Sequence, residues 1–114
     1  MSKEIDYNFF TKMDLRVGEV IEAEKVPKSR NLLKLIVDIG QEKPRQVISG
    51  ISNFYDPEEL IGKKYVFIVN LKPRKLMGLE SQAMILAADV DREAVLLKVD
   101  EKYFNKVKPG SKIV

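Results

Sequence analysis

Apolar and polar residues alternate over several short stretches of this chain, and a period of two residues is typical of half-buried β-strands. Residues 15–26 alternate in this way, and Gly18 inside them allows a bend or a bulge. Residues 64–71 are apolar on both faces, which indicates a central strand that is covered twice. Further strands are expected at residues 32–39, 46–49, 82–90 and 94–99, and residues 113–114 could add a last edge strand.

A short helix is expected at the N-terminus. Ser2 can cap it, and one face of the helix would carry four apolar residues, Ile5, Phe9, Phe10 and Met13. So much apolar surface on a short terminal helix must be covered. Two alternatives follow: the helix docks on its own domain, or it contacts a second copy of the chain.

A second helix is predicted between residues 56 and 62. Its residues fit the N-cap, the first helical position, the reciprocal capping-box position and the C-terminal stop: Asp56, Pro57, Glu59 and Gly62. Because capping accounts for Asp56, Glu58 and Glu59, these acids do not support a hydrolase. Asp100 could cap a further helical turn that contains Tyr103.

The order of these elements predicts the fold. Five or six short strands, with turn signals about every 8–12 residues and one helix between the third and fourth strands, indicate a small closed or nearly closed β-barrel. The predicted class is all-β with short helices: a five-stranded OB-fold β-barrel with an N-terminal helix and a C-terminal extension. At 114 residues we expect one domain, with residues 1–13 forming the helix and residues 14–114 the barrel and extension.

The composition excludes several classes of chemistry. The chain has no cysteine and no histidine, so disulfides, transition-metal sites and the common nucleophilic triads are not expected. We therefore expect no metal, no cofactor and no catalytic residue, and the chain by itself is not predicted to be an enzyme. The sequence contains no run of about 18 apolar residues, so no membrane span is predicted. The N-terminus carries acids and no apolar signal core, so a cytoplasmic location is expected.

The cations are unevenly distributed, although the net charge is only +3. Residues 28–75 hold ten cations and five anions, which fits a surface for a nucleic acid or another polyanion. Lys28 and Arg30 lie between the first two strands, and three more cations lie between two core strands: Lys72, Arg74 and Lys75. In an OB-fold these two loops flank one binding face. Each cation alone is typical of a solvated surface, but the set predicts a groove for a phosphate backbone.

Several segments together resemble a known family, the tRNA-binding OB-fold domains. The resemblance extends from Asp14 to Val114, and its order and spacing are more specific than any one segment. The matching segments are Asp14-Leu15-Arg16-Val17-Gly18, Leu33-Lys34-Leu35, Gln46-Val47-Ile48-Ser49-Gly50-Ile51, Asn70-Leu71-Lys72-Pro73, and Gly78 followed by Ser81-Gln82-Ala83-Met84. One departure is Ala83, where the family usually has glycine. The extra methyl group could narrow the approach to a ligand.

This resemblance implies a homodimer that recognises the folded shape of tRNA with little sequence preference. The N-terminal helix would then form part of the dimer contact. Asn70, Ser81 and Gln82 would hydrogen-bond bases, phosphates or the 2′-hydroxyl that distinguishes RNA from DNA; their alternative role is to close loops and turns. Met84 by its pattern belongs to the core, and only the resemblance makes it a candidate contact with a base or ribose.

The leading hypothesis is a structure-selective tRNA-binding protein, with no DNA or membrane partner. Family members occur as stand-alone dimers and as the C-terminal part or β subunit of methionyl-tRNA synthetases. The chain is therefore expected to be such a β subunit or detached C-terminal domain, and to supply tRNA affinity to the catalytic subunit. The alternatives are a stand-alone tRNA-binding protein or a secretion-related chaperone that binds unfolded polypeptides through apolar surface. Aromatic residues are few, and Phe54, Tyr55 and Tyr65 are expected in the core, so base stacking is not predicted to dominate.

Overall fold

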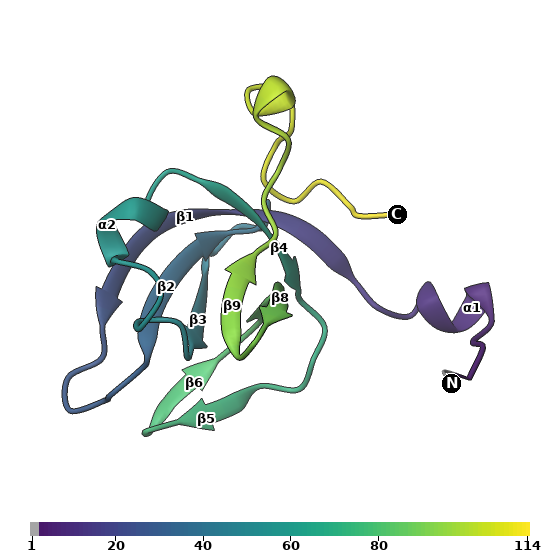
Figure 1. Ribbon diagram of the computed structural model, residues 1–114. Helices are drawn as coiled ribbons and strands as arrows, with labels where there is room; N and C mark the ends of the chain where they lie inside the picture. Colours follow the sequence, from purple (N-terminus) through teal and green to yellow (C-terminus); the bar gives the residue numbers. More distant parts are fainter. Residues whose placement is uncertain (1–2) are drawn as a thin grey trace.

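The computed structural model describes residues 3–114 and shows a strongly bent antiparallel sheet with short helices around it (Figure 1). The five strands of this sheet lie in the order β3-β2-β1-β4-β7. Their bounds are β1 Leu15–Lys25, β2 Leu33–Asp38, β3 Arg45–Ser49, β4 Lys64–Ile68 and β7 Met84–Ile85. The predicted class, a mostly β, five-stranded and nearly closed barrel, is confirmed.

Two small hairpins form separate two-stranded sheets. The first joins β5 (Arg74–Leu76) to β6 (Leu79–Ser81), and the second joins β8 (Ala87–Val90) to β9 (Glu93–Leu96). The first hairpin arises because Met77 and Gly78 have positive φ angles of 50° and 79°, as a type I′ turn requires. The stretch expected to be a simple basic loop therefore contains a hairpin.

The single strand expected at residues 82–90 is wrong, because the chain changes neighbours within it. β7 pairs with β4, whereas β8 pairs with β9. At the change, the Leu86 N–H donates to the Val66 carbonyl at 2.9 Å, and the Leu86 carbonyl accepts from the Leu97 N–H at 3.3 Å. An apolar run in the sequence does not say which partner each part of it will take.

The barrel interior is apolar and closely packed. Its largest fully buried side chain is Phe67, and Leu33, Leu35, Ile39 and Leu60 are also fully buried. Gly18 is needed for this close packing and does not form the expected bulge. A Cβ atom there would lie 2.6 Å from Val37 Cγ1 and 2.8 Å from Phe67 Cδ1, closer than side chains approach. The irregularity of β1 lies instead between Val20 and Glu22.

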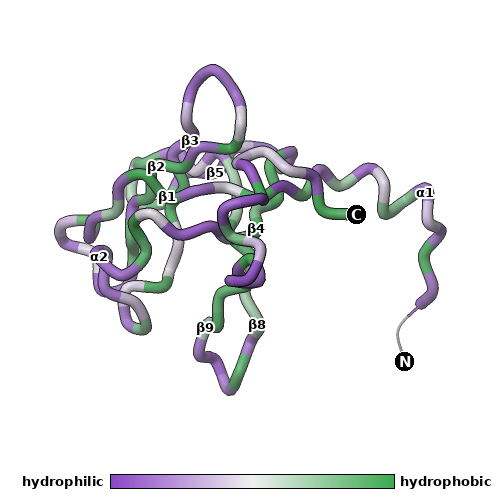
Figure 2. The backbone as a smooth tube through the Cα atoms, turned by 90° about the horizontal axis from the view of Figure 1, so that it is seen from above, coloured by the Kyte–Doolittle hydropathy of each residue, from purple (hydrophilic) through white to green (hydrophobic). Residues whose placement is uncertain are grey.

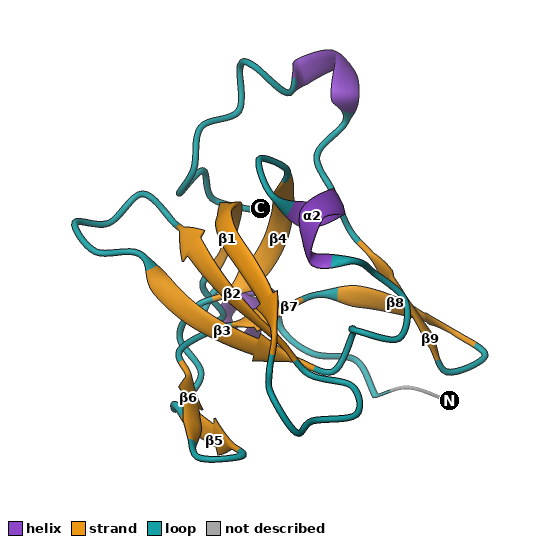
Figure 3. Ribbon diagram, turned by 90° about the vertical axis from the view of Figure 1, so that its left-hand side faces the viewer, coloured by secondary structure: helices purple, strands orange, loops and turns teal. Residues whose placement is uncertain are grey.

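Helix α2 (Pro57–Leu60) forms as predicted (Figure 3). The Asp56 N–H donates to Glu59 Oε2 at 2.9 Å, which is the reciprocal bond of a capping box. Gly62 ends the helix with a φ angle of +84°, and its N–H donates to the Val20 carbonyl of β1 at 2.8 Å. These bonds and the buried Leu60 attach α2 to the core.

The N-terminal helix α1 (Tyr7–Phe10) is one turn long and stands away from the barrel (Figure 2). Asp6 precedes it, while the predicted cap, Ser2, lies outside the described residues. Ile5, Tyr7 and Phe9 are 60%, 75% and 52% exposed. The alternative in which the apolar face docks on its own domain is therefore wrong. So short a helix is not stable alone and needs packing against another surface.

The C-terminal extension leaves the barrel, forms the 3-10 turn η1 (Glu101–Tyr103) and returns to β1 (Figure 1). As predicted, the Asp100 side chain caps this turn by accepting from the Lys102 N–H at 2.9 Å. The returning chain forms one β-bridge, between Lys112 and Arg16. The edge strand expected at residues 113–114 does not form. Among residues 3–114, no helix has the length and apolar character needed to cross a membrane.

Candidate nucleic-acid interface

Two cation-bearing segments lie at the same end of the barrel (Figures 1 and 3). We call residues 26–32, which join β1 to β2, the β1–β2 turn, and residues 70–82, which contain β5 and β6, the hairpin segment. The five predicted cations on them are exposed, and none makes an ion pair within residues 3–114: Lys28, Arg30, Lys72, Arg74 and Lys75. Their charges are therefore free to meet an anionic ligand.

The β1–β2 turn is held mainly by its own residues. Ser29 Oγ accepts hydrogen bonds from the N–H groups of Asn31 and Leu32, at 3.2 and 2.9 Å. The Ser29 N–H donates to the Val26 carbonyl at 3.1 Å. One bond leaves the turn, from the Ser52 N–H to the Asn31 carbonyl at 3.0 Å. The shape of this segment thus follows from local polar contacts.

The hairpin segment borders a small depression of about 100 Å³. Lys72, Arg74 and Met84 lie at it, and its apolar lining comes from Ile48, Leu71, Leu76 and Ala83. Met84 is 48% exposed, so the core position that its pattern predicts is wrong. Lys75 lies opposite Glu80 in the strand register of the hairpin, and it does not line this depression.

Ser81 is almost enclosed, at 8% exposure, and its hydroxyl is already occupied. Ser81 Oγ accepts from the Ile48 N–H at 2.9 Å and donates to the Ala83 carbonyl at 2.9 Å. This is the loop-closing arrangement that the sequence left open as the alternative to RNA contact.

The side-chain amides of Asn70 and Gln82 also form hydrogen bonds within the domain. Asn70 Oδ1 accepts from the Asp14 N–H at 2.9 Å, and its Nδ2 donates to the Lys12 carbonyl at 2.7 Å. Gln82 Oε1 accepts from the Gln46 N–H at 3.0 Å. Hydrogen bonds from these groups to RNA would compete with bonds already present.

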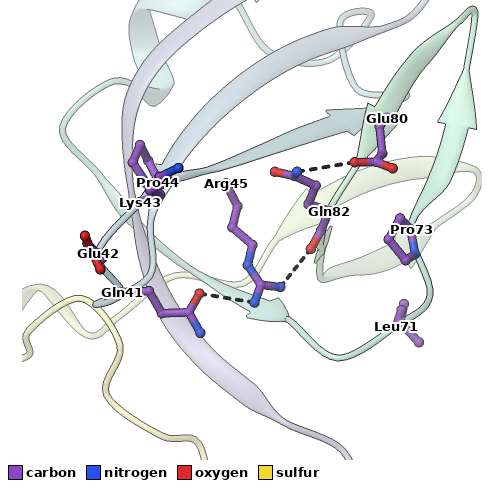
Figure 4. A pocket seen from close by; sticks show the side chains of 9 residues that line it. All are labelled: Gln41, Glu42, Lys43, Pro44, Arg45, Leu71, Pro73, Glu80 and Gln82. Carbon is purple, nitrogen blue, oxygen red and sulfur yellow. Dashed lines mark hydrogen bonds between the residues drawn. The ribbon is translucent and has the colours of Figure 1, made fainter.

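Sequence reasoning missed Arg45, which lies at the first position of β3 (Figure 4). Its Nη1 donates to the carbonyls of Val69 and Gln82, the latter at 2.9 Å, and its Nη2 donates to Gln41 Oε1 at 3.1 Å. Arg45 borders an open depression of about 590 Å³ between the β2–β3 turn and the hairpin segment. Two of its three partners are main-chain atoms far away in the sequence, so no local pattern could have predicted these contacts.

The base of the hairpin segment also carries an ion pair. Arg16 Nε lies 2.8 Å from Asp14 Oδ1. The hydrogen bond from Arg16 lowers the pKa of Asp14 below its usual 3.8, and it raises the pKa of Arg16. Asp14 thus remains ionised at neutral pH beside the Asn70 anchor.

The aromatic residues offer little stacking surface here. Tyr65 is buried as expected, and burial raises its pKa to about 12. Tyr55 is partly buried, and its hydroxyl accepts from the Leu96 N–H at 3.1 Å. Phe54 is 39% exposed, so its predicted core position is wrong. No aromatic side chain lines either of the two depressions. Within residues 3–114, no group of three or more acidic residues is placed to hold a metal ion.

Comparison with known proteins identifies the family. The model described as "Putative tRNA binding domain" matches residues 15–111, which include the barrel and both basic segments. The chain belongs to this family. It is 54% identical to the methionine–tRNA ligase of Methanocaldococcus jannaschii over 112 residues, which are 97% of this chain and 16% of the ligase. The corresponding ligase of Thermotoga maritima is 54% identical over 104 residues, and again 16% of its length is matched. The chain thus spans about one sixth of these relatives.

Solved structures agree with this assignment. A methionyl-tRNA synthetase-related protein from Pyrococcus horikoshii has 39% identity and a TM-score of 0.89, with 99% of this chain and 100% of that chain covered. The chaperone CsaA from Bacillus anthracis has 29% identity and a TM-score of 0.84, with 98% and 100% covered. The prediction of a tRNA-binding domain homologous to part of the methionine–tRNA ligases is confirmed.

Proposed function

We propose that this domain binds folded tRNA with the surface formed by the β1–β2 turn and the hairpin segment. The observation that carries the proposal is five exposed cations at one end of a barrel of this family, none of them in an ion pair among residues 3–114. Cations in this arrangement attract a phosphate backbone, and each phosphate they neutralise releases counterions.

The roles of the predicted contacts differ in this proposal. Lys72 and Lys75 act as point charges towards phosphates, while Arg74 can bind one phosphate in a bidentate way or stack on a base. Met84 offers a base or ribose a soft apolar surface beside Lys72 and Arg74. With few base-edge donors free and no aromatic platform, this surface reads the path of the backbone more than the base sequence.

A binding comparison tests the proposal. We expect tRNA to bind more tightly than both an unstructured RNA of the same length and a DNA copy of the tRNA sequence. Affinity for tRNA should fall as salt rises, by about 0.7–0.9 log units in K per log unit of salt for each phosphate neutralised. Equal affinity for the two RNAs, or binding that ignores salt, would contradict a shape-reading cationic surface.

The proposed biological role is to supply tRNA to a methionyl-tRNA synthetase, as a β subunit or a detached C-terminal domain. The support is the 97% of this chain that aligns within a methionine–tRNA ligase. The domain itself is non-catalytic in this proposal and works in the cytoplasm. Adding it to a synthetase catalytic subunit that lacks such a domain should lower the KM for tRNA and leave that for methionine unchanged, because only the local tRNA concentration rises.

We further propose that α1 and its neighbours, within residues 1–13, form a homodimer contact, with residues 14–114 as the RNA-binding body of a single domain. The exposed side chains of Ile5, Tyr7 and Phe9 support this. Light scattering should report a dimer, and Phe9→Ser should shift it towards monomer. A wild-type monomer at micromolar concentration would contradict this assembly.

The chaperone alternative remains in competition because of the CsaA similarity and the same apolar side chains. It predicts that the protein suppresses aggregation of an unfolded polypeptide and that excess tRNA does not compete. A protein without this activity that still binds tRNA would decide against it.

A further inference from the structure

We infer that Arg45 is a positioning residue for the RNA-binding surface. Its guanidinium fixes both ends of the hairpin segment on the barrel, so that the cations of this segment meet the phosphate backbone in a preformed arrangement. The consequence for RNA rests on the proposed function, but the consequence for the hairpin segment does not.

The geometry places one nitrogen atom between the two ends of the segment. Arg45 Nη1 donates to the Val69 carbonyl, just before the segment, and to the Gln82 carbonyl, at its end. Gln41 Oε1 holds the other terminal nitrogen at 3.1 Å and so orients the guanidinium (Figure 4). The planar guanidinium can serve these three acceptors together, whereas a lysine ammonium cannot reproduce the fork.

The seam between β3 and the hairpin segment has one main-chain bond, from the Gln82 N–H to the Gln46 carbonyl at 2.8 Å, and is otherwise closed by side chains. The N–H groups of Gln46 and Ile48 are taken by Gln82 Oε1 at 3.0 Å and by Ser81 Oγ at 2.9 Å. In return, Gln46 Nε2 donates to the Glu80 carbonyl at 2.9 Å. The two predicted RNA contacts Ser81 and Gln82 therefore act through the position of the hairpin, in the same way as Arg45.

We call these hydrogen bonds between β3 and the hairpin segment the frame. The frame matters because Lys72, Arg74 and Lys75 are long, flexible side chains on an excursion from the barrel. Ordering each of them on binding costs conformational entropy. If the base of the excursion is already fixed, only the side chains and not the backbone must be ordered. Losing the frame should thus weaken binding although every phosphate contact can still form.

A charge-conserving substitution separates positioning from direct contact with phosphate. We expect Arg45→Lys and Arg45→Met both to weaken tRNA binding by about tenfold, the cost of also ordering about one residue of the hairpin backbone on binding. The slope of log K against log salt should stay unchanged in both, because no phosphate contact is lost. Amide hydrogen exchange should accelerate in residues 74–81 and stay slow in β1 and β2. A purely global loss of stability would instead accelerate exchange in all these strands.

Lys43→Met is the matched control, because Lys43 is an exposed cation at the same depression and makes no side-chain hydrogen bond within residues 3–114. It should leave exchange in the hairpin unchanged. Gln41→Ala removes only the orienting acceptor and should act like the Arg45 variants but less strongly. This variant decides the question if both Arg45 variants fail to fold.

The opposite pattern would overturn the inference. If Arg45→Lys binds as wild type while Arg45→Met lowers the salt slope by about 0.7–0.9, Arg45 is a phosphate contact. Unchanged hairpin exchange in the Arg45 variants would refute the frame directly. If exchange accelerates but neutralising Lys72, Arg74 and Lys75 leaves tRNA affinity intact, the frame stands and the proposed RNA surface fails.

Discussion

The β1–β2 turn and the hairpin segment carry similar charge but are held in different ways. The turn is shaped by local bonds to Ser29, with one bond to Ser52 outside it. The hairpin segment is tied to β3 and to the N-terminal segment by side chains that are distant in sequence, notably Arg45 and Asn70. Similar composition thus gives two surfaces whose backbones are held by different kinds of contact, local in the turn and long-range in the hairpin segment. If long-range anchors fix a backbone more firmly than local bonds do, less remains to be ordered on binding, and the hairpin segment should contribute more affinity for each charge.

Removing the three cations of the hairpin segment should have the largest effect. We expect Lys72→Gln, Arg74→Gln and Lys75→Gln together to weaken tRNA binding by at least about 100-fold at low salt, because hydrogen bonds to charged groups contribute about 1.5–3 kcal/mol each. Filter binding across a salt series measures both affinity and slope. The control is neutralisation of Lys102, Lys106 and Lys108, three exposed cations of the C-terminal extension. An equal loss in the control would mean that net charge alone governs binding.

The β1–β2 turn offers a matched pair of charges for direct comparison. Lys28→Gln with Arg30→Gln removes one lysine and one arginine, as does Lys72→Gln with Arg74→Gln. Both doubles should reduce the salt slope by about 1.4–1.8 if each cation contacts a phosphate. The loss of affinity at the turn should be smaller, about tenfold or less, if local bonds leave more of its backbone to be ordered on binding. Identical losses in the same titration would show that prior fixing of the backbone is unimportant here.

Asn70→Ala tests the second anchor of the hairpin segment. It removes the bonds to the Asp14 N–H and the Lys12 carbonyl, both near solvent, so we expect the free energy of unfolding to fall by about 1 kcal/mol. Urea denaturation measures this. Asn53→Ala, at an exposed turn position, is the control and should change little. If Asn70→Ala leaves stability unchanged and only weakens RNA binding, Asn70 is a direct contact and not an anchor.

The ion pair beside this anchor should have the smallest effect. The pKa of Asp14 is lower in the folded state than its usual 3.8, so the pair stabilises the fold above that value and the contribution is lost as pH falls through the lower, folded pKa. Because the pair is partly exposed, we expect about 0.2–1 kcal/mol at neutral pH. Urea denaturation of Asp14→Asn at pH 7 and in acid measures it. A difference from wild type that persists in acid would point to a cause other than this charge.

Local patterns predicted the elements whose determinants lie within a few residues. The alternation of residues 15–26 predicted β1, and the Asp56–Gly62 signals predicted α2 and its capping bond. The cations of both basic segments were found for the same reason, because charge and turn residues are visible in the sequence. The hairpin around Met77 was missed, since a methionine at positive φ has no sequence signal.

The sequence by itself determined the barrel class and the positions of the exposed cations, because strand periodicity, capping and charge are properties of neighbouring residues. The family followed from the resemblance of several segments, in their order and spacing, to the tRNA-binding domains. Only the tertiary structure decided what closes the seam beside β3 and what Asn70, Ser81 and Gln82 bond to. It also revealed Arg45, whose carbonyl partners at Val69 and Gln82 come together only when the barrel folds. Hydrogen bonds between groups distant along the chain depend on where strands meet, and no local pattern encodes that meeting point.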